Sequence, residues 1–350
     1  MKVLKFGGTS VGSAQRMKEV AKLITDGEQK IVVLSAMSGT TNTLVEISDY
    51  LYKKNPEGAN EIINRLEAKY KQHVNELYST DEYKQKTQEF IKAQFDYIRS
   101  YTKDIFTLFE EKVILAQGEL ISTNMVTNYL QEQGVNAILL PALEFMRTDK
   151  NSEPDPVYIK EKLAAQLEIH PDAEIYITQG FICRNAYGEI DNLQRGGSDY
   201  TASLIGAAVN ASEIQIWTDI DGMHDNDPRI VDKTSPVRHL HFEEAAELAY
   251  FGAKILHPTC VQPAKYANIP VRLLNTMEPT APGTLISNDT EKGKESFGCL
   301  SQRQHHCHQD QIKPYVTGPR LLAQSIRNLR KLSDLYRHDL HFRGWRFRIH

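Results

Sequence analysis

A lysine and two glycines follow a short apolar segment near the start of the chain. The pair Val3-Leu4 leads into the run Lys5–Thr9, whose sequence is KFGGT. Glycine lets backbone N–H groups approach an anion closely, and the lysine supplies a mobile positive charge. Apolar residues then recur with helical spacing from Met17 to Ile24, so a helix is expected to begin near Ser13. A strand, a glycine turn and a helix in this order are the layout of a phosphate site, although the chain contains no Walker pattern.

Short apolar segments rich in Val and Ile alternate with helical segments up to about residue 290. The strand candidates are Val3–Phe6, Ile31–Ser35, Val135–Leu140, Glu174–Thr178, Ile214–Thr218 and Val271–Leu274. This alternation predicts an α/β fold with a mainly parallel sheet that helices cover on both faces. Residues 42–112 interrupt it with a long polar stretch of helical period, which predicts an insertion of two or three helices on one side of the sheet.

The composition is that of a globular protein, with 41% hydrophobic and 25% charged residues. No apolar stretch approaches the length of a membrane span, so no membrane partner is expected. The first residues lead straight into a strand, without the apolar segment of a signal peptide. The four cysteines form no C-x-x-C motif and no disulfide framework, which fits a reducing compartment. We therefore expect a cytoplasmic protein.

Residues 291–350 differ from the rest of the chain in charge. They carry 12 Lys and Arg against 5 Asp and Glu, in a chain whose net charge is −4. We place a domain boundary here, between a main domain at 1–290 and an atypical basic, His- and Arg-rich tail at 291–350. The adjacent side chains of His305–His308 cannot easily surround one tetrahedral ion, so no metal site is predicted. The basic run Arg320–Arg348 contains no recognisable nucleic-acid module, so nucleic acid is not an expected partner.

A second glycine motif lies at Arg195–Tyr200, with the sequence RGGSDY. Ser198 is a good helix N-cap, and Asp199 falls in the first helical turn, where a negative charge is favoured. Arg195 can bind a carboxylate through two parallel N–H bonds, so Arg195 and Asp199 together match the two ends of a zwitterion. The alternative is a plain glycine turn that enters a capped helix, with both charges solvated.

Two further segments carry small, hydroxylic or acidic residues beside predicted strands. Ser35–Asn42 follows the second strand, and such residues at the carboxyl end of a strand are typical of an α/β ligand crevice. The alternative is an ordinary loop in which Thr41 or Asn42 caps the next helix. Gln117–Ser122 is expected to open another helix, where Glu119 is either a capping acid or a ligand for an amine.

Acidic residues and a glycine turn follow the fifth predicted strand. Trp217–Gly222 contains Asp219, and Asp227–Arg229 forms an Asp-Pro-Arg corner, features that fit a nucleotide. A calcium loop is rejected because the glycine stands at the wrong step and no glutamate closes the loop. Phe251–Pro258 places Lys254 near a glycine turn, where it either covers phosphates or is an ordinary lysine at a helix C-terminus.

Together these motifs resemble those of the aspartokinases in the amino-acid-kinase family. The matching stretches, in order, are Lys5–Ser10, Ser35–Asn42, Gly118–Ser122, Arg195–Tyr200, Trp217–Asp219, Asp227–Arg229 and Gly252–Pro258. KFGGTS together with RGGSD separates aspartokinases from relatives that act on glutamate, acetylglutamate, carbamate or uridylate. The helical insertion also resembles the kinase part of bifunctional aspartokinase/homoserine dehydrogenases.

The resemblance implies a three-layer αβα sandwich with the amino-acid-kinase fold. It also implies ATP-dependent phosphorylation of the L-aspartate β-carboxylate to 4-phospho-L-aspartate, the first step of threonine, methionine and lysine synthesis. A carboxylate nucleophile is already ionised at neutral pH, so no general base is needed. Phosphoryl transfer then depends on positioning and on neutralising charge, with Mg²⁺ carried on the phosphates.

The same resemblance implies a role for individual residues. The catalytic residues are Lys5 and Asp199. The substrate-binding residues are Ser35, Thr41, Glu119, Arg195 and Ser198. The nucleotide-binding residues are Lys5, Gly7, Gly8, Ser10, Thr218, Asp219, Asp227, Arg229 and Lys254.

Two features depart from the family pattern. His224 stands where many relatives have a tyrosine before the Asp-Pro-Arg corner, so it is not counted among the site residues. Aspartokinases continue into ACT-type regulatory domains, which the residues after about Lys294 do not resemble. We interpret the tail as an out-of-frame or replaced C-terminus on a truncated bifunctional enzyme. Because ACT domains normally supply dimer contacts, a homo-oligomer is not favoured.

Two other functions fit parts of this pattern. One is a truncated, binding-only or inactive fragment of the bifunctional enzyme, which loads aspartate or ATP without turnover. The other is a kinase for a different acid, such as glutamate or an N-acetyl amino acid. Glu119 and Asp199 argue against an acylated amine, because two acids would then lack a positive partner.

Overall fold

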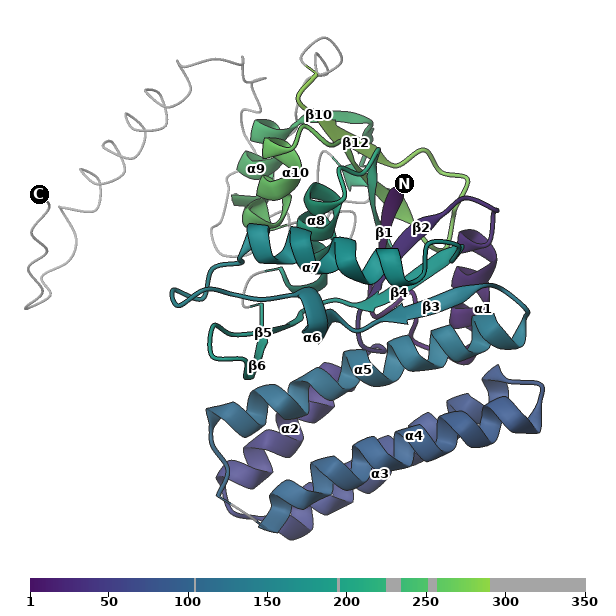
Figure 1. Ribbon diagram of the computed structural model, residues 1–350, viewed down its shortest axis with the longest axis vertical. Coiled ribbons are helices and arrows are strands. Elements are labelled where there is room, and N and C mark those ends of the chain that lie inside the picture. Colours follow the sequence, from purple (N-terminus) through teal and green to yellow (C-terminus); the bar gives the residue numbers. More distant parts are fainter. Residues whose placement is uncertain (104, 194–195, 225–233, 251–256, 290–350) are drawn as a thin grey trace, which may run out of the picture. The chain divides into compact units, whose positions relative to one another are not determined.

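The computed structural model describes residues 1–103, 105–193, 196–224, 234–250 and 257–289 (Figure 1). Within these ranges, no helix has the length and apolar character needed to cross a membrane. The boundary expected near residue 290 and the tail at 291–350 fall outside the described residues. The division into two domains therefore stays a prediction.

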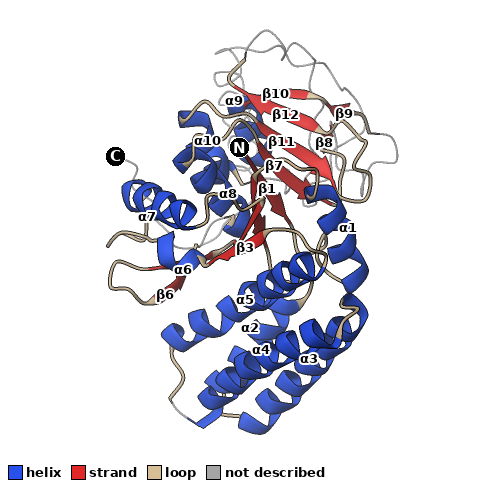
Figure 2. Ribbon diagram, turned by 45° about the vertical axis from the view of Figure 1, so that its right-hand side comes forward, coloured by secondary structure: helices blue, strands red, loops and turns tan. Residues whose placement is uncertain are grey.

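A sheet of eight strands lies at the centre of the described chain (Figure 2). Its spatial order is β10-β12-β11-β7-β1-β2-β4-β3, and every neighbouring pair is parallel except β11 and β12. The strands are Lys2–Phe6 (β1), Lys30–Leu34 (β2), Ala137–Leu140 (β3), Ile175–Gln179 (β4), Ile214–Thr218 (β7), His239–His241 (β10), Val271–Asn275 (β11) and Thr284–Ser287 (β12). Two small antiparallel pairs are Ile182–Arg184 (β5) with Ile190–Asn192 (β6), and Met223–His224 (β8) with Pro236–Val237 (β9).

The predicted strands and the mainly parallel α/β fold are confirmed, and strand ends differ from the prediction by no more than two residues. The strands that the sequence did not reveal are short and partly polar, such as β6 (IDN) and β10 (HLH). An apolar pattern of two or three residues is too brief to indicate a strand by itself. These strands depend on their pairing partners rather than on local preference.

Helices cover both faces of the sheet and give the expected three layers. The face of α1 (Ala14–Ile24) also carries α2 to α5, whereas α8 (Gly197–Ala208) packs on the opposite face with α7 (Pro156–Ile169) and α10 (Gln262–Tyr266) beside it (Figure 2). Alternate strand residues such as Leu4 and Val32 belong to the core on the α1 face. Val3, Ile31 and Val33 on the other face are buried as well, as expected for strands covered on both sides. Shorter elements are Ala142–Phe145 (α6), Phe242–Tyr250 (α9), Tyr101–Lys103 (η1) and Pro258–Val261 (η2).

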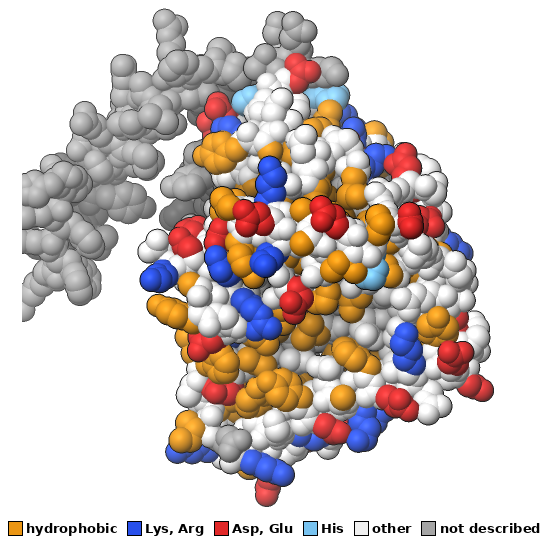
Figure 3. All heavy atoms as spheres, in the orientation of Figure 1, with side chains coloured by type: hydrophobic (Ala, Val, Ile, Leu, Met, Phe, Trp, Pro, Cys, Tyr) orange, Lys and Arg blue, Asp and Glu red, His pale blue; other side chains and the backbone are white. Residues whose placement is uncertain are grey.

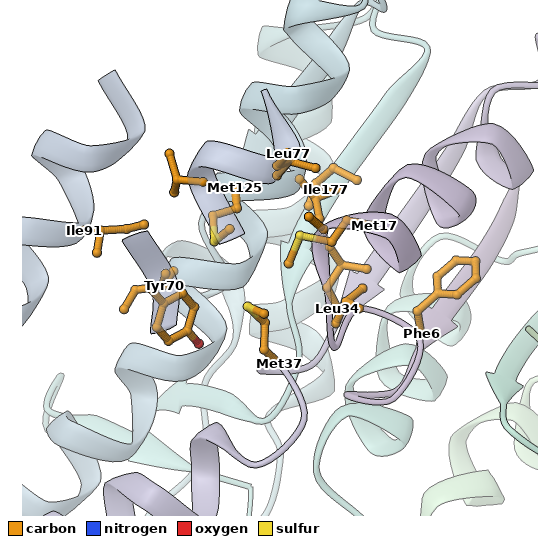
Figure 4. Packing of buried hydrophobic residues seen from close by; sticks show 14 of the residues in the cluster. Phe6, Met17, Leu34, Met37, Tyr70, Leu77, Ile91, Met125 and Ile177 are labelled. Carbon is orange, nitrogen blue, oxygen red and sulfur yellow. The ribbon is translucent and has the colours of Figure 1, made fainter. Parts of the chain in front are cut away.

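A bundle of four helices packs on the α1 side of the sheet (Figure 1). Its members are Thr40–Tyr52 (α2), Pro56–Leu77 (α3), Asp81–Ser100 (α4) and Leu108–Glu132 (α5). The stretch 42–112 therefore holds most of α2, all of α3 and α4, and the start of α5. Buried bundle residues form one core with residues of α1 and the sheet, among them Tyr70, Leu77, Ile91 and Met125 with Met17 and Leu34 (Figure 4).

The segment Gln117–Ser122 lies in the middle of α5, so the prediction that it opens a helix was wrong. A capping box formed by Thr107 and Glu110 starts this helix ten residues earlier. Gly118 is inside the helix because α5 passes close to the segment after β2. A Cβ at Gly118 would lie 2.7 Å from the Cβ of Ala36. The glycine thus marks a close approach of two elements rather than a turn.

Candidate active site

The carboxyl ends of four adjacent strands meet at one edge of the sheet. Phe6 of β1 lies in register beside Leu34 of β2 and Trp217 of β7, and Leu34 lies beside Gln179 of β4. The chain leaves β1 toward β2 on one side and returns to β7 on the other, so the strand order reverses here. In open α/β sheets, ligands bind in the crevice outside strand ends at such a reversal.

A cleft of about 320 Å³ opens at this edge. It is formed by the loop after β1, the segment from the end of β2 into α2, one residue of α5, the loop after β4 and the start of α8. The lining residues are Gly8, Ser35, Ala36, Met37, Ser38, Gly39, Thr41, Asn42, Glu119, Phe181, Gly197 and Ser198. The structure therefore brings together five of the predicted site residues, namely Gly8, Ser35, Thr41, Glu119 and Ser198.

Two helices begin at the cleft with a glycine as N-cap and without a side-chain cap. α2 follows Gly39 (φ 81°) and α8 follows Gly196 (φ 66°). By contrast, a side chain caps the start of α1, α3, α5 and α7. None of Thr41, Asn42 and Ser198 acts as the cap that the sequence suggested. An uncapped helix start presents free N–H groups and a partial positive charge, so two of them favour an anionic ligand in this cleft.

Lys5 and Asp199, the two residues expected to be catalytic, form an ion pair beside the cleft. Lys5 Nζ lies 2.8 Å from Asp199 Oδ1, and the side chains are 12% and 18% exposed. Lys5 comes from β1 and Asp199 from the first turn of α8, so the pair joins the two glycine motifs of the sequence. Asp199 is thus already engaged by one cation in the ligand-free protein.

Small residues allow the loops around the cleft to approach one another closely. Ser35 Oγ donates a hydrogen bond of 2.8 Å to Ser198 Oγ, which links the end of β2 to the start of α8. A Cβ at Gly8 would lie 2.8 Å from the carbonyl oxygen of Ala36, closer than such atoms normally come. The loop after β1 therefore needs glycine at this position to sit against the loop after β2.

Glu119 supplies a buried carboxylate at the cleft. Its side chain is 3% exposed, and Oε1 accepts the backbone N–H of Ala36 at 3.2 Å. Oε2 has no hydrogen-bond partner among the described residues. Burial raises the pKa of Glu119 to about 8, because the ionised form loses its hydration. A cation bound in the cleft would lower this pKa and provide the missing partner, so the site is built to receive a positive group.

The predicted phosphate loop is tied to neighbouring strands. Gly7 N–H donates to the carbonyl of Trp217 at 3.3 Å. Ser10 is fully buried, and its hydroxyl bonds to that of Thr276 at 2.7 Å. Ser10 thus fastens the glycine loop to the residue that follows β11. A nucleotide role for Ser10 stays a prediction.

The acidic segment after β7 combines one exposed acid with one structural acid. Thr218 Oγ1 accepts a backbone N–H two residues further on, at 3.0 Å, and Asp219 is exposed. Asp221 lies 3.0 Å from the guanidinium of Arg238 and also accepts the backbone N–H of Gly283 at 3.1 Å. Neither Thr218 nor Asp219 lines the 320 Å³ cleft, so a nucleotide role for them stays a prediction.

Four of the predicted site residues lie outside the described residues. They are Arg195, Asp227, Arg229 and Lys254. Their roles stay predictions. His224, the departure from the family pattern, is described, and its Nδ1 lies 2.8 Å from the hydroxyl oxygen of Thr234.

Phe181 is a cleft residue that the sequence did not reveal. It follows β4 with a left-handed backbone (φ 68°), and its N–H donates to Thr201 Oγ1 at 3.0 Å. Its ring packs against Gly197, where an added Cβ would lie 3.4 Å from Cδ2. A positive φ at a bulky residue is uncommon and often marks a functional segment. The preceding Gly180 was the available signal, but glycine also follows many strands that have no part in a site.

The chain is similar in sequence to known proteins. A family model described as the amino acid kinase family matches residues 1–275. Aspartokinase 1, chloroplastic, of Arabidopsis thaliana is 36% identical over 308 residues, which cover 83% of this chain and 53% of that protein. A bifunctional aspartokinase/homoserine dehydrogenase of Buchnera aphidicola is 30% identical, over 92% of this chain and 40% of its own length.

A solved structure shows the same fold. The crystal structure of E. coli aspartokinase III in complex with aspartate and ADP superposes with a TM-score of 0.75 and 33% sequence identity. The match covers 83% of this chain and 65% of that one. The chain thus spans about half the length of the Arabidopsis relative and about two thirds of the solved E. coli structure.

Proposed function

The chain belongs to the amino acid kinase family, as its motifs predicted, and from this premise we propose that it is an aspartate kinase. It transfers the γ-phosphoryl group of ATP to the β-carboxylate of L-aspartate and yields 4-phospho-L-aspartate and ADP. The observation that carries the proposal is the cleft itself. One cleft combines two uncapped helix starts with the buried, half-partnered carboxylate of Glu119, and the Lys5–Asp199 pair lies beside it.

Aspartate has the charge distribution that this cleft would stabilise. Its α-ammonium group would pair with Glu119, whose Oε2 lacks a partner in the described residues. Asp199 is less suited to that role than the sequence suggested, because Lys5 already holds it. The two carboxylates would take the positive helix starts, with Thr41 and Ser198 as hydroxyl donors and Arg195 as the proposed partner of the α-carboxylate.

The chemical step needs little from the protein beyond position and charge. A β-carboxylate oxygen attacks the γ-phosphorus, the bond from that phosphorus to the β–γ bridging oxygen breaks, and ADP leaves with the electron pair. No proton has to be removed, because the carboxylate is ionised at neutral pH. Lys5 would neutralise charge on the transferred group, and Asp199 would hold its ammonium in place.

The nucleotide would lie along the loop after β1 and the segment after β7. We propose Gly7, Gly8 and Asp219 on this side, together with Asp227, Arg229 and Lys254. Among the described residues, no group of three or more His, Cys, Asp or Glu is placed to hold a metal ion. We propose a Mg²⁺ ion that would be coordinated mainly by the phosphates and would neutralise them when bound.

The alternatives receive less support. A binding-only fragment would have no need for the Lys5–Asp199 pair beside the substrate cleft. An N-acylated amino acid would leave Glu119 without a positive partner in a buried position. On the face of the described residues shown in Figure 3, acidic and basic side chains are interspersed, which differs from the basic surface expected for nucleic acid. We also propose a cytoplasmic enzyme, in keeping with the buried thiol of Cys183.

Trapping the acyl phosphate with hydroxylamine tests the proposal. The purified chain is incubated with MgATP, hydroxylamine and either L-aspartate, L-glutamate, N-acetyl-L-aspartate or no amino acid. We expect hydroxamate with aspartate alone. A folded protein that gives no hydroxamate with aspartate, or gives as much with N-acetylaspartate, would show that the assignment is wrong.

A further inference from the structure

Helix α3 of the bundle contacts the segment that lines the cleft after β2. The hydroxyl of Tyr70 on α3 lies 2.9 Å from Thr40 Oγ1, and both side chains are 1% exposed. Thr40 is the first residue of α2 and directly follows its N-cap, Gly39. A buried hydrogen bond from the bundle therefore fixes one side of the turn that starts α2.

The neighbouring residue of α3 holds the other side of the same turn. Lys69 Nζ donates to the carbonyl oxygen of Ser38 at 3.2 Å. Consecutive residues of α3 thus bond the residues immediately before and after Gly39. A Cβ at Gly39 would meet no atom within 4 Å, so packing does not fix the turn at the glycine itself. Backbone bonds from Ser38 N–H to the carbonyl of Gly8 at 3.0 Å and from Thr40 N–H to the carbonyl of Met37 at 2.9 Å also hold this segment, and the two bonds from α3 tie the turn to the bundle.

The same contacts lie close to the acidic side chain of the cleft. Burial raises the pKa of Tyr70, its bond to Thr40 opposes this shift, and the nearby charge of Glu119 raises the pKa further. α5 also packs against Thr40, since an added Cβ at Gly118 would lie 3.3 Å from Thr40 Cγ2. Figure 4 shows Tyr70 in the bundle and Met37, of the cleft segment, on neighbouring elements of the core. Tyr70 and Thr40 therefore stand where the bundle, α5 and the cleft meet.

We propose that Lys69 and Tyr70 are positioning residues for the amino-acid substrate. They hold the Ser38–Thr40 turn so that the uncapped start of α2, with Thr41, points its N–H groups into the cleft. This inference rests on the proposed function, because it assigns the α2 start to aspartate. It gives the helical bundle a part in substrate binding although only Glu119 and the α2 start reach the cleft from it.

Two pairs of variants separate positioning from plain stability. Tyr70→Phe removes the hydroxyl and keeps the ring in the core. Its matched control is Tyr78→Phe, since Tyr78 is also buried and donates to the carbonyl of Met125 at 2.7 Å, away from the residues that line the cleft. Lys69→Met removes the exposed amine. Its control is Lys71→Met, because Lys71 lies on the same helix and pairs with Glu67 at 2.7 Å.

The kinetic test compares the change in the KM for aspartate with the change in the KM for ATP. Loss of one hydrogen bond to the turn should raise the KM for aspartate about three- to tenfold in Tyr70→Phe and in Lys69→Met. The KM for ATP should change less than the KM for aspartate, since the turn reaches the nucleotide loop only through the bond from Ser38 N–H to the carbonyl of Gly8. The controls should keep both constants even where Tyr78→Phe lowers the melting temperature. Equal effects in test and control variants would overturn the proposal.

Hydrogen exchange gives a readout that does not depend on turnover. The amides of Thr40 and Thr43, which donate to the carbonyls of Met37 and Gly39, should exchange faster in Tyr70→Phe and Lys69→Met than in the wild type, and should be unchanged in the two controls. If the test variants show the expected faster exchange but the wild type makes no hydroxamate, the kinase proposal is refuted and the positioning of the turn stands. Active wild type with unchanged exchange and unchanged aspartate KM in both test variants would refute the positioning alone.

Discussion

Replacing Glu119 by glutamine gives the sharpest test of how the cleft works. In the ligand-free protein, burial raises the pKa of Glu119 to about 8, against an ordinary value of 4.5. The folded state therefore holds a proton that the unfolded chain has released throughout the interval between these two values. Stability must fall as the pH rises through this interval, because the unfolded state binds fewer protons.

The size of the effect follows from the two pKa values. Each pH unit in the interval costs about 1.4 kcal/mol, so wild type loses about 3 kcal/mol relative to Glu119→Gln between pH 4.5 and pH 7. The difference is measured by urea unfolding of both proteins at several pH values. Comparing the two proteins at each pH cancels the titration of all other groups.

Binding of aspartate should reverse the protonation of Glu119. Because the α-ammonium group favours the ionised carboxylate, a protein with a pKa of about 8 should release about 0.9 proton per aspartate bound at pH 7. Calorimetry in two buffers of different ionisation enthalpy measures this release. The apparent affinity for aspartate should rise nearly tenfold from pH 6 to pH 7, and Glu119→Gln should abolish both effects.

Glu67 provides a matched control with the opposite sign. It is also a buried bundle carboxylate, but although burial alone would raise its pKa, bonds from Arg99 and Lys71 lower it below the usual value. Glu67→Gln should therefore lose stability relative to wild type as the pH rises through the lowered pKa toward 4.5, and should not alter proton release. If wild type releases no proton and its aspartate affinity does not depend on pH, Glu119 does not receive the ammonium group and the reasoning fails.

Three further variants test single contacts. Lys5→Ala should reduce turnover by about 10²–10³-fold while calorimetry still detects aspartate binding, because Lys5 acts on the transferred group; lost binding with intact turnover would contradict this role. Gly8→Ala should cost about 1–3 kcal/mol in urea unfolding and raise the KM for ATP, because its Cβ would meet the Ala36 carbonyl oxygen at 2.8 Å. Ser10→Ala should cost about 1–3 kcal/mol by leaving the buried Thr276 hydroxyl unpaired, whereas a lower affinity for ATP without any loss of stability would contradict this structural role.

The central strands and the grouping of the motifs were predictable because both depend on short-range patterns. A strand buried on both faces, such as β2 (KIVVL), is apolar at nearly every position and stands out in the sequence. The ends of parallel strands must also meet at one edge of the sheet. Residues that follow different strands, such as Ser35 after β2 and Lys5 near the end of β1, are therefore neighbours by topology alone.

The details of the cleft were not predictable, because they depend on contacts between distant segments. Ser198 has the side chain of a good N-cap, yet its hydroxyl bonds to Ser35 and the N-cap is Gly196, two residues earlier. Glu119 was expected near a helix start, but it lies in the middle of α5, next to Gly118. That glycine exists because α5 passes against Ala36, a contact that no local pattern contains.

These details share one physical feature, which is that the ligand-free cleft leaves favourable interactions unmade. Two helices start without side-chain caps, and a typical cap is worth about 1 kcal/mol. Glu119 is buried without a positive partner among the described residues, and Phe181 holds a left-handed backbone. Each feature lowers the stability of the empty protein, and a ligand that carries an ammonium group and two carboxylates offsets the first two. We therefore expect aspartate to raise the unfolding free energy more in wild type than in Glu119→Gln. Equal stabilisation of the two proteins by aspartate would mean that the unpartnered carboxyl group of Glu119 contributes to the fold rather than to substrate binding.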